Sequence, residues 1–128
     1  MPSTAIAATR QRTRILVVED ELMIRMLLED MLGELGYTVA LEAARIEEAL
    51  EAVNSAEFDL AILDVNLNGQ PISPVADALA ARGRPFVFAT GYGQSSLPEP
   101  YRNRPTLKKP FQIDGLKRAI ESVLDGKS

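Results

Sequence analysis

The chain has 128 residues, a length that suits one domain, and it is 46% hydrophobic and 25% charged, as in an ordinary globular protein. Its net charge of −4 makes the body of the protein a poor match for nucleic acid phosphates, and no apolar run approaches the ~20 residues of a membrane span. Cysteine and histidine are absent, which excludes disulfides, thiolate and imidazole metal sites, Ser-His-Asp catalysis and a phosphohistidine relay within the chain. The remaining carboxylates, hydroxyls and amines favour hard cations such as Mg²⁺.

The first half of the chain predicts a tail, two strands and two helices. Residues 1–13 contain no acidic residue and are rich in Ala, Thr, Ser and Arg, which is typical of a disordered N-terminal tail. Residues 14–18 (RILVV) predict a buried strand, and apolar residues at helical spacing predict a helix from about residue 21 to residue 35. We expect a second strand over residues 37–43 and a second amphipathic helix whose apolar face carries Ile46, Ala49, Leu50 and Val53.

A third strand, a third helix and a fourth strand follow. Residues 60–64 (LAILD) predict a buried strand that ends in a carboxylate. Ser73 followed by Pro74 is a helix start signal, with Ser73 as the N-cap and Pro74 at the first helical position. This helix is expected to run to about Arg82, and residues 85–90 (PFVFAT) predict the fourth strand.

The last part of the chain lacks one helix of the alternating pattern. Residues 91–104 contain glycines and prolines without an apolar stripe, so we expect no well-formed helix there. Residues 105–110 (PTLKKP) hold a short fifth strand, residues 112–124 predict the last helix, and residues 126–128 form a C-terminal tail. The single domain expected over residues 14–125 is α/β and flavodoxin-like, a doubly wound five-stranded parallel sheet in the order 2-1-3-4-5.

Three carboxylates fall at the carboxyl ends of two strands that are neighbours in this order. Glu19 and Asp20 follow the first strand, and Asp64 ends the third. Adjacent strands lie ~4.8 Å apart, so these groups are expected to converge in the crevice where open α/β sheets bind ligands. Carboxylates that close repel one another unless a cation intervenes, and Mg²⁺ usually takes one or two carboxylates, waters and a phosphate.

A hydroxyl group and an ammonium group complete the predicted site. Thr90 ends the fourth strand, and Lys109 ends the fifth at about two strand spacings, or ~10 Å, from Asp64. The flexible stem of a lysine can bring its charge to that side of the site. A carboxylate nucleophile, a cation site, a hydroxyl and an ammonium suit phosphoryl transfer onto Asp64.

Each of these residues also has an ordinary structural explanation. Glu19 and Asp20 could cap the first helix and complement its positive end, and Asp64 could begin a turn. Thr90 alone is uninformative, and a single lysine such as Lys109 is most often a solvated surface residue. All five fall at strand ends in the order that the fold requires, which favours a functional site.

Four motifs at these positions resemble the receiver domain of bacterial two-component response regulators: VVEDE, ILDVNLNG, FATG and KKPF, at the first, third, fourth and fifth strands. The resemblance covers about residues 14–124. It implies that Asp64 is the phosphoacceptor and that Asp20 binds Mg²⁺ directly. It also implies that Glu19 binds the ion through water and that the backbone carbonyl of Asn66 completes the protein ligands.

The resemblance further implies that Thr90 and Lys109 grip the phosphoryl oxygens and that the Lys109–Pro110 bond is cis. The chain departs from the family's usual pattern in three places. Asn68 stands where most receivers have Pro, Thr106 stands where most have the aromatic switch residue, and a Gly/Pro-rich segment replaces the fourth helix. The motifs PFVFATGYG and PTLKKPF together resemble the FATGUY subfamily, many of whose members are single-domain receivers.

These departures argue against an aromatic side-chain switch and against dimerisation through the helix 4–strand 5–helix 5 face. We hypothesise instead that phosphoryl capture by Thr90 orders residues 91–104, an order–disorder transition in which Tyr92 is the best-placed aromatic residue. A monomer or weak dimer is expected.

The expected protein is a stand-alone cytoplasmic receiver with no output domain attached. Because it has no histidine, it must take its phosphoryl group from a sensor histidine kinase, a histidine phosphotransfer protein or a small-molecule donor. It is expected to signal by protein–protein contact or phosphorelay and to catalyse only its own phosphorylation and dephosphorylation. Neither nucleic acid nor a membrane is an expected partner.

Three other functions fit the sequence less well. A phosphatase of the haloacid dehalogenase type would use Asp64 as its nucleophile, but the second Asp that it needs is replaced by Asn66. A nucleotide or flavin binder needs a Gly-rich or hydroxyl-rich phosphate loop after the first strand, where this chain has Glu-Asp-Glu. A degenerate receiver that acts only as an interaction module would not need the full set of acceptor residues.

Overall fold

The computed structural model describes residues 13–91 and 96–125. Its helices and strands are β1 (Arg14–Val18), α2 (Leu22–Glu34), β2 (Thr38–Ala43), α3 (Ile46–Ser55), β3 (Leu60–Asp64), β4 (Asn66–Leu67), β5 (Gln70–Pro71), α4 (Ser73–Ala81), β6 (Phe86–Thr90), η2 (Glu99–Tyr101), β7 (Thr106–Lys108) and α5 (Ile113–Asp125). None of the helices within the described ranges is long and apolar enough to cross a membrane.

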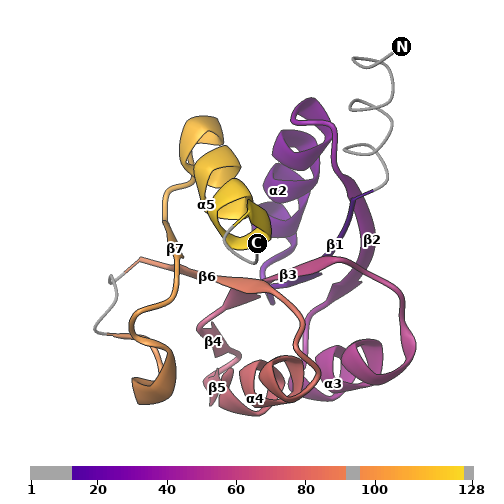
Figure 1. The fold of residues 1–128 in the computed structure, drawn as a ribbon, viewed down its shortest axis with the longest axis vertical. Coiled ribbons are helices and arrows are strands. Elements are labelled where there is room, and N and C mark those ends of the chain that lie inside the picture. Colours follow the sequence, from indigo (N-terminus) through magenta and orange to yellow (C-terminus); the bar gives the residue numbers. More distant parts are fainter. Residues whose placement is uncertain (1–12, 92–95, 126–128) are drawn as a thin grey trace.

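Five parallel strands form the central sheet in the order β2-β1-β3-β6-β7. This confirms the predicted flavodoxin-like order, because β6 and β7 are the fourth and fifth strands of this sheet. Helices α2 and α5 cover one face of the sheet, and α3 and α4 cover the other (Figure 1). The strand order reverses between β1 and β3, so a ligand crevice is expected at the carboxyl ends of these two strands.

Two apolar clusters, one on each face of the sheet, hold the layers together. In β1, Leu16 and Val18 pack towards α3 and α4, whereas Ile15 and Val17 pack towards α2 and α5. The four apolar residues of β3 are at most 1% exposed. Because both faces of the sheet are covered, its inner strands are apolar throughout, which explains why they are visible in the sequence as continuous runs.

The start of α4 differs from the prediction. Ile72, and not Ser73, occupies the N-cap position, and no side chain caps this helix. Ile72 is fully buried and has φ −80° and ψ −4°, whereas a capping side chain usually requires an extended backbone. Packing of Ile72 therefore outweighs the capping preference of Ser73. Pro74 still lies in the first turn, where the missing N–H breaks no helical hydrogen bond.

A two-stranded antiparallel hairpin, which was not among the predicted elements, follows β3. Leu67 of β4 pairs with Gln70 of β5. The two residues between them, Asn68 and Gly69, have φ values of 51° and 82°. Positive φ at both central residues is the signature of the type I′ hairpin turn, for which Asn-Gly is a preferred sequence.

The described residues between β6 and β7, which are 91 and 96–104, contain no α-helix, as predicted. They include the 3₁₀ helix η2. Leu97 and Tyr101 from this stretch are buried in the cluster on the α3 and α4 side. The Tyr101 ring packs edge-on against Phe86, and its hydroxyl donates a hydrogen bond to Asp77 of α4. These two side chains supply core contacts in a stretch that has no α-helix to supply them.

Three predictions lie outside the described residues: the tail over residues 1–12, the role of Tyr92 and the C-terminal tail over residues 126–128. Thr13, the last residue of the predicted N-terminal tail, is described. Its carbonyl accepts a hydrogen bond of 3.0 Å from the N–H of Thr38, so the pairing of the first two strands already begins there.

Candidate functional site

The three predicted carboxylates meet at the carboxyl ends of β1 and β3. These strands pair in register, with Val18 opposite Leu63, so Glu19 and Asp20 emerge beside Asp64. One carboxylate oxygen from each of the three lies within 4.8 Å of the others. Glu19 is 1% exposed, and the other two are partly buried. The convergence expected from the sequence is therefore confirmed.

Lys109 reaches the same cluster from the end of β7, the edge strand of the sheet. Its Nζ lies 3.2 Å from Oε1 of Glu19 and 3.5 Å from Oδ1 of Asp64. The Lys109 N–H donates to the carbonyl of Thr90, which fixes the residue just beyond β7. The Lys109–Pro110 bond is cis, as the family resemblance implied. The lysine therefore bridges two carboxylates and is not a solvated surface residue.

The site holds more negative charge than its lysine offsets. Burial raises the pKa of Glu19 to about 7, although the N–H of Glu21 and the Lys109 charge oppose this. Burial also raises the pKa of Asp64, against the Lys109 charge and a hydrogen bond from the Asn66 N–H. Burial alone would lower the pKa of Lys109, but the two carboxylates outweigh it and raise that pKa. A second cation beside these carboxylates would therefore be stabilised.

Glu19 is held by its peptide group as well as by its side chain. Its N–H donates to the carbonyl of Ala43 at 2.9 Å, and its carbonyl accepts a 2.7 Å hydrogen bond from the guanidinium of Arg25. Arg25 is in turn ion-paired at 3.1 Å with Glu42, the residue before Ala43. The Glu19 carboxylate also accepts the N–H of Glu21, the N-cap residue of α2. This N–H belongs to the N-cap residue itself and not to the first turn of α2, so the helix-capping role weighed for Glu19 is not observed.

The hairpin after β3 contributes backbone donors. The N–H of Asn68 donates to Oδ2 of Asp20 at 3.2 Å, and the side-chain oxygen of Asn66 accepts the N–H of Gly69 at 2.8 Å. The Asn66 N–H donates a hydrogen bond to the Asp64 carboxylate, and this bond opposes the rise of the Asp64 pKa. The ligand role of the Asn66 carbonyl stays a prediction. Asn68 makes a contact here that a proline could not make, because proline has no N–H.

Thr90 lies at the end of β6, next to the strand that carries Asp64. Asp64 pairs with Ala89 across the two strands, and Thr90 follows Ala89 directly. The Thr90 side chain is 3% exposed, and its Oγ1 is 2.9 Å from Oγ of Ser96. This hydrogen bond connects the site to the stretch before η2. Ser96 was not predicted, because nothing in its Gly- and Pro-rich surroundings distinguishes it from a solvated serine.

The donor set fits a hard divalent cation. Three carboxylates converge beside backbone groups, without any nitrogen or sulfur ligand, and hard cations such as Mg²⁺ prefer oxygen ligands. An ammonium group on one side and a buried hydroxyl at the next strand end provide donors for further oxygen atoms of a bound group. The arrangement can therefore hold a cation and an oxyanion side by side.

Comparisons with known proteins agree on one family. The sequence profile of the Response regulator receiver domain matches residues 15–121. Transcriptional regulatory protein PdtaR of Mycobacterium tuberculosis is 37% identical over 124 residues, which are 94% of this chain and 60% of PdtaR. Sporulation initiation phosphotransferase F of Bacillus subtilis is 28% identical over 90% of this chain and 96% of its own length.

Solved structures are also similar. The solution structure of SdrG from Sphingomonas melonis Fr1 has 47% sequence identity and a TM-score of 0.80, and it covers 89% of this chain and 98% of SdrG. A BeF3-activated conformation of SdrG has 48% identity and a TM-score of 0.76, over 87% of this chain and 95% of that one. This chain thus spans only 60% of the length of PdtaR but nearly all of the SdrG chain.

Proposed function

We propose that this chain, which belongs to the response regulator receiver domain family, accepts a phosphoryl group on Asp64 in a Mg²⁺-dependent reaction. The observation that carries the proposal is the meeting of Asp64 with two other carboxylates and with the Lys109 ammonium, 3.5 Å from its Oδ1. Phosphoryl transfer needs positioning and charge stabilisation more than covalent help from the protein, and this cluster provides both.

In the proposed step, an oxygen of Asp64 attacks the phosphorus of a phosphohistidine. The P–N bond breaks, its electron pair leaves with the donor imidazole, and an acyl phosphate forms on Asp64. The Lys109 ammonium and the Thr90 hydroxyl would donate to the phosphoryl oxygens. Mg²⁺, when bound, would offset the negative charge of the carboxylates and of the phosphoryl oxygens. The residues that would hold it are Asp20, Asp64, the Asn66 carbonyl and, through water, Glu19.

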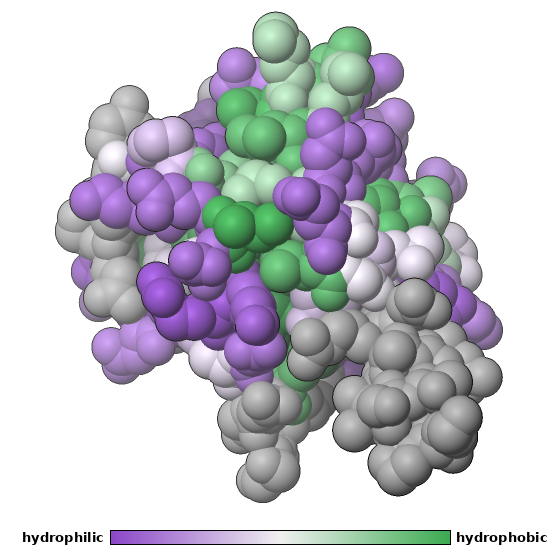
Figure 2. All heavy atoms as spheres, turned by 90° about the horizontal axis from the view of Figure 1, so that it is seen from above, coloured by the Kyte–Doolittle hydropathy of each residue, from purple (hydrophilic) through white to green (hydrophobic). Residues whose placement is uncertain are grey.

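The donor is proposed to be a sensor histidine kinase or a histidine phosphotransfer protein. An exposed apolar surface on α2, close to the acidic cluster, suits contact with such a partner: Met23 is 80% exposed, and Leu22, Met26 and Leu27 are also exposed. The face of the molecule that carries α2 and α5 shows hydrophobic side chains gathered between hydrophilic ones (Figure 2). One relative is named a phosphotransferase, which agrees with onward relay as one route of output besides protein–protein contact.

The chain would catalyse only its own phosphorylation and, later, hydrolysis of the acyl phosphate. It would act in the cytoplasm, as is typical of receiver domains, and as a monomer or weak dimer. The motifs PFVFATGYG and PTLKKPF, together with the lack of an α-helix in the described residues between β6 and β7, support its assignment to the FATGUY-type receivers.

Labelling with acetyl phosphate tests the proposal. Incubation with acetyl phosphate and Mg²⁺ should add the mass of one phosphoryl group, and Asp64→Asn or removal of Mg²⁺ with EDTA should abolish this gain. Steady release of phosphate from an ester substrate would instead indicate a phosphatase. Absence of both labelling and turnover, with the fold intact by circular dichroism, would leave only a passive interaction module.

A further inference from the structure

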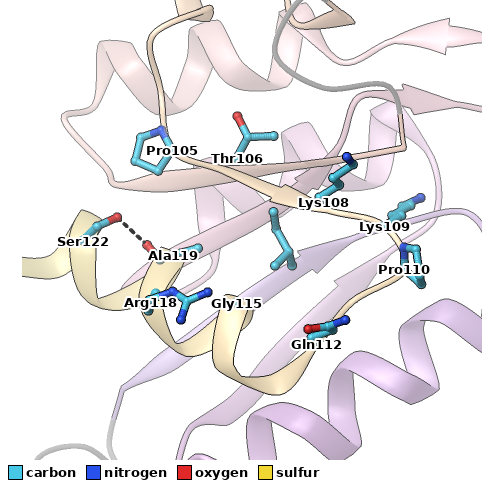
Figure 3. Close-up of a pocket in the computed structure, with 11 residues that line it drawn as sticks. Pro105, Thr106, Lys108, Lys109, Pro110, Gln112, Gly115, Arg118, Ala119 and Ser122 are labelled. Carbon is cyan, nitrogen blue, oxygen red and sulfur yellow. Dashed lines mark hydrogen bonds between the residues drawn. The ribbon is translucent and has the colours of Figure 1, made fainter.

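A groove of about 670 Å³ lies between β7 and α5, and Lys109 of the acidic cluster lines one end of it. We call it the β7–α5 groove. Figure 3 shows its two walls: the strand residues from Thr106 to Lys109 on one side and the helix residues Gly115, Arg118, Ala119 and Ser122 on the other. Of these residues, the family resemblance concerns only Lys109, in the phosphoryl site, and Thr106, at the position where most receivers have the aromatic switch residue.

The strand that forms one wall of the groove is the open edge of the sheet. Within the described part of the chain, β7 pairs with β6 and with no other strand. Lys109 directs its N–H to the Thr90 carbonyl of β6. Because alternate residues of a strand direct their backbone groups to opposite edges, Lys108 and Thr106 present theirs to the outside. An edge of this kind is a template for a further strand.

The helix that forms the other wall carries small side chains. Gly115, Ala119 and Ser122 lie one or two turns apart on α5 and line the groove. A Cβ placed on Gly115 would approach no described side chain more closely than 3.9 Å, at Leu107, so the groove is open at that point. The Ser122 hydroxyl donates back to the Ala119 carbonyl and does not extend into the groove as a donor. A peptide backbone can therefore approach β7 without a steric barrier from α5.

The charge of the groove has one sign. Its lining contains Lys108, Lys109 and Arg118 and no carboxylate, although the chain as a whole carries a net charge of −4. Lys109 is engaged with Glu19 and Asp64. Lys108 and Arg118 make no ion pair within the described residues and are exposed. They remain as two unneutralised cations along the open edge.

We propose that the β7–α5 groove binds an extended, acidic segment of a partner protein, which adds to the sheet as a strand beside β7. Backbone hydrogen bonds to the edge would supply affinity, and Lys108 and Arg118 would select acidic side chains. This chain's own residues 1–12 carry two arginines and no carboxylate, so they do not complement the groove. A second copy would bring the same cations to the shared edge. The proposal does not depend on phosphorylation of Asp64.

The probe is a fluorescein-labelled peptide of alternating glutamate and valine, blocked at both ends, and its binding is measured by fluorescence anisotropy. Arg118→Glu should weaken binding at least ~10-fold, whereas Lys117→Glu, the same charge change on the neighbouring α5 residue outside the groove, should change it less than ~2-fold. The same peptide methylated on alternate backbone nitrogens keeps its charges but cannot pair fully as a strand, so it should also bind at least ~10-fold more weakly. The amides of Thr106 and Lys108 should become protected from hydrogen exchange when the unmethylated peptide binds.

Four results would overturn the proposal. Absence of binding would show that the edge is not a docking site. An equal effect of Lys117→Glu and Arg118→Glu would indicate diffuse electrostatic attraction. Undiminished binding of the methylated peptide would exclude strand addition. Displacement of the peptide by oligo-dT would assign the groove to nucleic acid. Loss of peptide binding as the protein dimerises would assign it to a second copy of the chain.

Discussion

Glu19 is the most constrained residue of the site, because both sides of its peptide group and both oxygens of its carboxylate have partners. Arg25 makes one of these contacts, because its guanidinium donates to the Glu19 carbonyl. The same guanidinium is ion-paired with Glu42. Arg25 touches none of the reacting groups. Its expected effect on the reaction is to position the acidic loop after β1.

We therefore predict that Arg25→Ala weakens Mg²⁺ binding about 10-fold and slows labelling by acetyl phosphate while the fold is retained. The guanidinium hydrogen bond would be lost, and one hydrogen bond to a charged group contributes about 1.5–3 kcal/mol. Arg25→Lys should restore part of the affinity. The measurement is a Mg²⁺ titration followed through backbone amide shifts of residues 19–21 and 64–66.

Arg14→Ala provides the matched control for Arg25→Ala. Arg14 also pairs with an acidic residue, Glu57 at 3.2 Å, but at the opposite end of β1. If both variants lost the same Mg²⁺ affinity, general destabilisation and not positioning would be the cause.

The residues of the site were predictable to the extent that topology alone places them. Glu19, Asp20 and Asp64 meet because they end adjacent strands, and a pattern of strands is enough to infer that. Arg25 and Ser96 were not predicted, because their roles depend on how a side chain reaches across to another element. No spacing along the chain records such contacts.

At the scale of elements, the β4–β5 hairpin connects β3, which ends in Asp64, to Asp20 of the acidic cluster. The Asn-Gly sequence at its turn is a known hairpin signal, but strands of two residues are too short to show alternation. The long apolar strands, in contrast, were found from their sequence because burial on both faces leaves continuous runs. The capping signal at Ser73 failed for a related reason, since burial of Ile72 set the helix start.

Asn68→Pro should impair the site even though proline is common at this position in the family. Proline cannot adopt the φ of 51° found here and cannot donate to Asp20. We expect about 10-fold weaker Mg²⁺ binding and slower labelling by acetyl phosphate, measured together with urea unfolding. Asn68→Gly keeps both the N–H and the positive φ, so near-normal binding is expected there. Normal Mg²⁺ binding by Asn68→Pro would show that the hairpin turn does not support the site.

The stretch after β6 is the element expected to respond to phosphorylation. Thr90 now shares a hydrogen bond with Ser96, and Leu97 and Tyr101 fasten the following residues to the core. A phosphoryl group that captured the Thr90 hydroxyl would change this contact first. We predict that beryllofluoride with Mg²⁺ alters amide exchange over residues 96–104, with greater protection.

Two comparisons make the exchange experiment specific. Thr90→Val should abolish the change over residues 96–104, whereas exchange in α3, which lies away from the site, should be unaffected in both proteins. Equal protection of this stretch with and without beryllofluoride would refute the switch hypothesis. The part of that hypothesis that concerns Tyr92 lies outside the described residues and stays a prediction.

At the scale of the whole molecule, the acidic cluster should destabilise the fold when no cation is bound. The pKa of Glu19 is raised from 4.5 to about 7, so the folded protein binds this proton more tightly than the unfolded chain does. Protonation of Glu19 therefore stabilises the folded protein. This stabilisation is complete below pH 4.5 and is lost as the pH rises through about 7. The raised pKa of Asp64 acts in the same direction. The Lys109 pKa is raised from 10.5, so its titration lies above this window.

We therefore predict that, in EDTA, the free energy of unfolding falls between pH 5 and pH 8 more steeply for the natural protein than for Glu19→Gln. The difference should approach an upper limit on the order of 3 kcal/mol, from about 1.4 kcal/mol for each pH unit of the shift. Urea unfolding at several pH values measures it. The Glu57 side chain is 84% exposed, so the control variant Glu57→Gln should have the same dependence of unfolding free energy on pH as the natural protein. Adding Mg²⁺ should restore stability most strongly at pH 8, where the carboxylates are ionised, and equal slopes for all three proteins in EDTA would contradict the argument.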